Sequence, residues 1–62
     1  MCEANAFLIR DGKKELLLES VDEVEIGTDE VRLINIFGEQ RILNARFRRY
    51  SAADRELVFE AN

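Results

Sequence analysis

The chain contains no histidine, no tryptophan and no proline, and it has only one cysteine among its 62 residues. Without histidine, neither an imidazole metal site nor a Ser–His or Cys–His catalytic pair can be built. A single cysteine cannot form an intramolecular disulfide, so the chain is unlike the disulfide-stapled domains of small secreted proteins. The lack of proline, together with three glycines, suits regular structure with a few tight turns.

The length predicts a single domain, residues 1–62, and modest stability. A chain of about 60 residues buries only about 60% of the surface that its unfolded form exposes, so an interface between copies would extend the core. No apolar run approaches the roughly 20 residues of a membrane span, and the N-terminus lacks the features of a signal peptide. We therefore expect a cytoplasmic protein.

Charge is distributed unevenly around the net value of −4. Residues 1–30 hold nine acidic and three basic residues, a balance of −6, whereas residues 31–62 hold four and six, a balance of +2. A net acidic chain is poorly suited to sequence-independent nucleic-acid binding, which depends on neutralising phosphates. The positive second half leaves room for a local basic surface.

Short apolar segments separated by turn residues predict β-strands. The expected strands cover residues 2–10, 13–19, 21–26, 31–37, 40–50 and 55–60. Asp11-Gly12 predicts a type I′ hairpin turn, Gly38 a second tight turn, and the spacing of Val21 and Val24 a bend or bulge. Regularly spaced short strands predict an all-β fold, a small antiparallel SH3-like or Sm-like barrel of five to six strands.

Three other segments have a structural and a functional interpretation. Residues 51–54 are expected to form a turn, although Ser51 and Asp54 resemble a capping box that would open a helical turn. The acidic stretch 22–30 is interpreted as a solvated surface, because its spacing fits no calcium loop. Residues 35–40 are interpreted as a tight turn, with a partner-binding hairpin tip as the alternative.

Cys2 provides the only thiolate ligand in the sequence, directly after Met1. The terminal amine, the Cys2 amide nitrogen and the Cys2 sulfur would close two five-membered chelate rings around a metal ion. This planar donor set favours Ni(II) or Cu(II) over Zn(II), which prefers a tetrahedral site. The alternatives are a cysteine that is simply buried and a disulfide between the Cys2 residues of two chains.

One chain lacks the further soft donor that would complete four-coordination. A two-fold dimer would bring two Cys2 thiolates to one ion on its axis. Because binding would release protons from the thiol and the nitrogen donors, metal affinity should rise with pH. The sequence therefore predicts a metal site that requires two copies of the chain.

Four segments carry a family resemblance: the opening Met-Cys-Glu-Ala-Asn-Ala, residues 11–15, residues 21–24 and the run 31–41. Together they resemble the CooT family, small nickel-binding proteins linked to maturation of nickel-dependent carbon monoxide dehydrogenase. The resemblance covers nearly the whole chain, and Asn-Ile-Phe-Gly-Glu-Gln at residues 35–40 is its most specific part.

The resemblance implies a homodimer with an SH3-like or Sm-like fold and one Ni(II) at the interface, bound through the N-terminal cysteine. By position, that role comes to Cys2, and it selects nickel over copper. Met1 would supply its amine if it is retained, whereas its removal would expose the amine of Cys2. The implied function is that of a nickel carrier or metallochaperone, with a nickel enzyme or its maturation proteins as partners.

An arginine cluster gives the alternative hypothesis, an Sm-like RNA-binding module that uses the surface of Arg41, Arg46 and Arg48. Aromatic residues interleaved with arginines are typical of single-strand RNA surfaces. The favoured interpretation places Phe47 in the core and pairs the arginines with the acidic half of the chain. An enzyme is not expected, because no catalytic constellation is present and so small a domain has little volume for a pocket.

Overall fold

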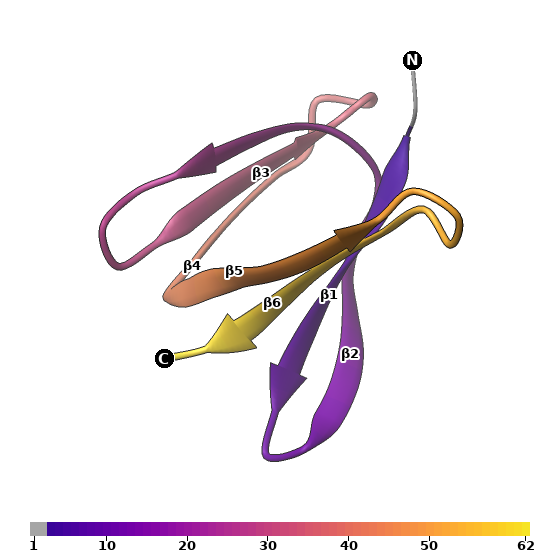
Figure 1. Ribbon diagram of the computed structural model, residues 1–62. Helices are drawn as coiled ribbons and strands as arrows, with labels where there is room; N and C mark the ends of the chain where they lie inside the picture. The colour runs from indigo at the N-terminus through magenta and orange to yellow at the C-terminus, as the bar shows by residue number, and fades with distance from the viewer. Residues whose placement is uncertain (1–2) are drawn as a thin grey trace.

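A coiled six-stranded β-sheet forms the fold (Figure 1). The computed structural model describes residues 3–62. The strands are β1 (Ala4–Arg10), β2 (Lys13–Ile26), β3 (Val31–Asn35), β4 (Gln40–Leu43), β5 (Ala45–Ser51) and β6 (Glu56–Ala61). Their hydrogen-bonded order is β4-β3-β2-β1-β6-β5. No helix long and apolar enough to cross a membrane occurs among these residues.

The predicted all-β, barrel-like fold is confirmed, with two refinements. β1 and β6 pair in parallel, whereas every other neighbouring pair is antiparallel. The sheet coils but does not close, because β4 and β5 remain its two edges. Among the residues described, the predicted barrel is therefore open.

A bend in β2 allows the sheet to coil. The strands expected at residues 13–19 and 21–26 form one continuous strand, in which Ser20 has a φ of 58°. The register with β3 shifts between Val21 and Glu23, which confirms the bend predicted from the valine spacing. Before the bend β2 pairs with β1, and after it mainly with β3, so one strand serves both halves of the sheet.

The predicted turns have the expected backbone geometry. Asp11 and Gly12 have φ values of 53° and 76°, as a type I′ turn requires. The segment at residues 52–55 is a turn without a helix, and the Asp54 N–H donates to Ser51 Oγ at 3.4 Å. The strand expected over residues 40–50 is divided at Asn44 into β4 and β5.

The core lies on the inner, concave side of the coiled sheet. Its buried residues are Ala6, Leu8, Leu18, Val21, Val31, Leu33, Ala45 and Phe59. Phe59 of β6 is the largest of the fully buried side chains among the residues described. The buried set draws on β1, β2, β3, β5 and β6, so the two hairpins and the C-terminal strand share one core.

Candidate functional site

The predicted metal ligands, Met1 and Cys2, lie outside the described residues. Cys2 precedes the start of β1 at Ala4 by two positions in the sequence. Within residues 3–62, no group of three or more cysteine, aspartate or glutamate side chains is arranged to hold a metal ion. Since the sequence has no histidine, the first two residues remain the candidate metal donors.

The start of β1 is held between two turns. The Asn5 N–H donates to the carbonyl of Arg55 in the β5–β6 turn at 2.9 Å. Asn5 Oδ1 accepts a hydrogen bond from the Ser20 N–H at the bend of β2, at 3.2 Å. Figure 1 shows β1 starting beside the β5–β6 turn. The point from which residues 1–2 extend is therefore fixed relative to both halves of the sheet.

The end of β3 lies close to this point. Ala4 on β1 is in register with Val21, and Val21 is in register with Asn35 on β3. Adjacent strands lie about 4.8 Å apart, so two strand spacings, about 10 Å, separate Ala4 from Asn35. The β3–β4 turn is therefore a near neighbour of the start of β1.

Asn35 organises the β3–β4 turn. Its side chain is buried, with the residue 4% exposed. Its Oδ1 accepts hydrogen bonds from the N–H groups of Phe37 at 3.0 Å and Glu39 at 2.8 Å, and its Nδ2 donates to Glu39 Oε1 at 2.7 Å. Gly38 has a φ of 85°, which confirms the predicted tight turn. The turn holds Phe37 outward, with 73% of that residue exposed.

The arginines of β5 are paired with carboxylates, but not with those expected. Arg46 and Arg48 both contact Glu60 Oε1 at 3.2 Å, and Arg49 contacts Glu56 at 3.8 Å. The expectation that they pair with the acidic first half of the chain is therefore wrong. The reason is topological, because β6 is the only strand hydrogen-bonded to β5 in the described sheet and brings these two acids across from the arginines.

Phe47 contacts the core from the open edge of the sheet. Its ring meets that of Phe59 edge to face, with centroids 5.7 Å apart, yet the residue is 41% exposed. Strict alternation predicts that Arg49 shares the face of Phe47, but the register shifts between these two residues and Arg49 faces Glu56. Arg41 lies on β4 and lines a different hollow, so it is not part of the β5–β6 ion pairs.

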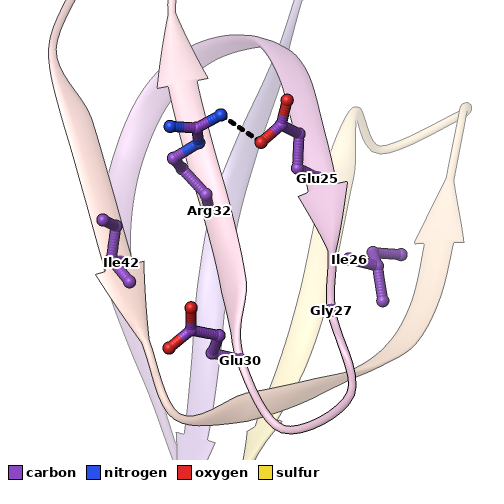
Figure 2. A pocket seen from close by; sticks show the side chains of 6 residues that line it. All are labelled: Glu25, Ile26, Gly27, Glu30, Arg32 and Ile42. Atoms are coloured by element: carbon purple, nitrogen blue, oxygen red, sulfur yellow. Dashed lines mark hydrogen bonds and ion pairs between the residues drawn. The ribbon is translucent and has the colours of Figure 1, made fainter.

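A hollow that sequence reasoning missed lies at the other end of β3 (Figure 2). It is an open depression of about 300 Å³, lined by Glu25, Ile26, Gly27, Glu30, Arg32 and Ile42. Arg32 forms an ion pair with Glu25 across β3 and β2. No sequence motif predicts this hollow, because its lining comes from three strands and a turn that the fold brings together.

Comparison with known proteins identifies the family. The CooT family, described as CO dehydrogenase accessory protein CooT, matches residues 1–60. The chain belongs to the CooT family. A crystal structure of a candidate CooT from Carboxydothermus hydrogenoformans is 34% identical, with a TM-score of 0.89 over 98% of each chain. No curated protein matches the chain.

The CooT assignment confirms the resemblance drawn from the sequence and agrees with the coiled all-β fold. The family description places CooT proteins as accessory to CO dehydrogenase. The β3–β4 turn and the start of β1 both lie within the matched residues.

Proposed function

We propose that the chain is a non-enzymatic accessory protein that carries nickel for a nickel enzyme, with CO dehydrogenase or its maturation proteins as partners. It would act as a homodimer that binds one Ni(II) at the interface through Cys2 of each chain. The observation that carries the proposal is the position of Cys2, the only cysteine, at residue 2 of a histidine-free chain of the CooT family.

The donor chemistry supports nickel. Thiolate sulfur with amine and amide nitrogens makes a strong planar donor set, which suits Ni(II) and disfavours a tetrahedral zinc site. The nitrogen donors would be the Met1 amine and the Cys2 amide, or the Cys2 amine where Met1 is removed. A site made by two chains would also supply a route for release, since separating the chains would leave each with half of the donors.

Titration of the metal-free protein with Ni(II) tests the proposal. We expect thiolate-to-nickel charge-transfer absorption that saturates at one Ni(II) per two chains. Replacement of Cys2→Ser should abolish that absorption and weaken nickel binding by more than about 100-fold, since it removes the soft donor from each chain. Nickel binding by Cys2→Ser as tight as that of the parent chain would show that the site is wrong.

A short N-terminal extension serves as the second variant. It retains the Cys2 thiolate but moves the free amine away from it. A weaker affinity and a changed spectrum are expected, whereas an unchanged spectrum would exclude the terminal amine as a ligand.

The RNA-binding hypothesis receives less support. Arg46 and Arg48 share the carboxylate of Glu60, which reduces the positive charge available to phosphates.

A further inference from the structure

The β3–β4 turn presents an apolar tip that local packing does not explain. Phe37 is 73% exposed and its neighbour Ile36 is 43% exposed. Phe37 is also the most exposed of the large hydrophobic residues that the structure describes. We call Ile36 and Phe37 the apolar tip.

We propose that the apolar tip and the hollow beside it form the surface on which a second copy of this chain docks. This inference rests on the proposed function in one respect, because the nickel site is taken to require two chains. It adds which residues of the fold would hold those chains together.

The tip is held in place by its backbone. Five consecutive N–H groups, those of residues 35–39, all donate hydrogen bonds within the protein. The Ile36 N–H donates to the carbonyl of Ser20 at 3.0 Å, which ties the turn to the bend of β2. A side chain exposed on such a turn loses little backbone freedom on binding, so its burial contributes efficiently to association.

The hollow beside the tip has a mainly polar lining with one apolar wall, against which an aromatic ring could pack. It has a volume of about 310 Å³ and an apolar wall formed by Leu16, Leu17 and Leu18 of β2. Leu16 is 52% exposed there, so apolar area remains to be covered. Phe37 itself lies on the rim of this hollow, as do Glu39 and Arg41.

The adjacency of tip and hollow favours a second copy as the occupant. In a two-fold dimer the same surface serves both chains, so a projection and a recess placed side by side can fit reciprocally. A two-fold axis next to Phe37 would place the Phe37 of each chain in the hollow of the other. Another protein would need a matching projection and recess, whereas a second copy already has both.

The surface lies near the start of β1, the strand that follows the proposed nickel ligands in the sequence. Asn35, at the base of the turn, lies two strand spacings, about 10 Å, from the start of β1. The hollow also includes Glu19, the residue before the bend that binds Asn5. Docking through the apolar tip would therefore bring the starts of the two β1 strands to the same region of the dimer.

Sedimentation equilibrium of the metal-free protein, with chelator and reductant present, tests the inference without nickel and without disulfides. We expect the parent chain to be a dimer and Phe37→Asp to raise the dimer dissociation constant by at least about 100-fold, because a charge would be placed in each hollow. Leu16→Glu should also raise the dimer dissociation constant, because it places a charge in the hollow that receives Phe37.

Ile42→Asp is the matched control. Ile42 is 62% exposed on β4 but lines the hollow at the other end of β3. It should leave dimerisation unchanged, and far-UV circular dichroism should show the parent fold for all three variants. A monomeric parent chain, a Phe37→Asp variant that dimerises normally, or equal effects of Phe37→Asp and Ile42→Asp would each overturn the inference.

The outcome is separable from that of the nickel titration. A dimer that depends on Phe37 but binds no nickel would support the docking surface and contradict the nickel proposal. Binding of one Ni(II) per two chains, together with a Phe37→Asp variant that dimerises as the parent does, would support the nickel proposal and contradict the docking surface. Capture of another protein at the apolar tip of a monomeric chain would overturn the inference and assign the surface to a partner of different sequence.

Discussion

The two ends of β3 are built in opposite ways. At the β2–β3 end, the turn at residues 27–30 is closed by one backbone hydrogen bond, from the Gly27 N–H to the Glu30 carbonyl at 2.8 Å. The Asp29 carbonyl accepts a second contact, from Asn62 Nδ2 at 2.8 Å. At the β3–β4 end, every backbone N–H of residues 35–39 donates within the protein.

The two turns also differ in the polarity of the side chains that they expose. The lightly bonded turn, residues 27–30, carries exposed polar side chains, and the apolar residues exposed nearby, Ile26 and Ile42, lie on the flanking strands β2 and β4. The heavily bonded turn carries Phe37, whose exposure is unfavourable in an isolated chain. A turn that is fixed by hydrogen bonds and yet exposes an aromatic ring is therefore better explained by recognition than by loose packing. Disrupting each end in turn tests this contrast.

The largest expected effect comes from Asn35→Ala. The substitution removes the acceptor of the Phe37 and Glu39 N–H groups from a residue that is 4% exposed. Leaving these part-buried N–H groups without their acceptor should lower the free energy of unfolding by about 2 kcal/mol. Urea unfolding followed by far-UV circular dichroism, at one fixed chain concentration, measures the change.

Asn62→Ala is the matched asparagine at the other end. It removes the exposed contact with the Asp29 carbonyl and should change the unfolding free energy by no more than about 0.5 kcal/mol. Similar losses for the two variants would contradict the contrast between the ends of β3.

A smaller effect is expected from glycine substitutions in the two turns. Gly38 has a φ of 85°, and no neighbouring atom lies within 4 Å of the position that an added Cβ would occupy, so Gly38→Ala is opposed only by the backbone conformation. Its expected cost is about 1 kcal/mol. At Gly27 the added Cβ would lie 3.2 Å from the Glu30 carbonyl oxygen, in an exposed turn that can shift slightly.

Gly27→Ala should therefore cost less than Gly38→Ala, and the same urea experiment compares them. The Gly38→Ala chain should also dimerise less well, because strain in the turn would displace Phe37. If Gly27→Ala lowered the free energy of unfolding more than Gly38→Ala, the β2–β3 turn would be the more constrained of the two.

The sequence predicted most of the local structure of this fold. Period-two apolar segments, Asp11-Gly12 and Gly38 are local signals, and local hydrogen bonding is sufficient to satisfy them. The parallel pairing of β1 with β6 was missed, because alternation of apolar residues says which face is buried and not which strand lies alongside. The carboxylate partners of the β5 arginines were missed for the same reason.

The candidate site also has one part that the sequence predicts and one part that only the fold reveals. Cys2 stands out in the sequence because its chemistry depends on residue type and on its place beside Met1. The hollow next to Phe37 could not be predicted, since it joins β2, the β3–β4 turn and Arg41 of β4. The Asn35–Gln40 run was recognised as a tight turn, but only the bend at Ser20 places that turn near the start of β1.

The smallest expected effect concerns the ion pair between Glu25 and Arg32 in the hollow of Figure 2. Both side chains are substantially exposed, at 51% and 41%, so water and salt screen their attraction. A double-mutant cycle with Glu25→Gln and Arg32→Gln should give a coupling energy of about 0.5 kcal/mol or less, and added salt should reduce it further. A coupling energy well above about 1 kcal/mol that persists in salt would mean that this end of β3 is as firmly built as the Asn35 end. The firmness of the β3–β4 turn would then no longer distinguish the two ends, and the argument for recognition at the apolar tip would depend on the dimerisation measurements alone.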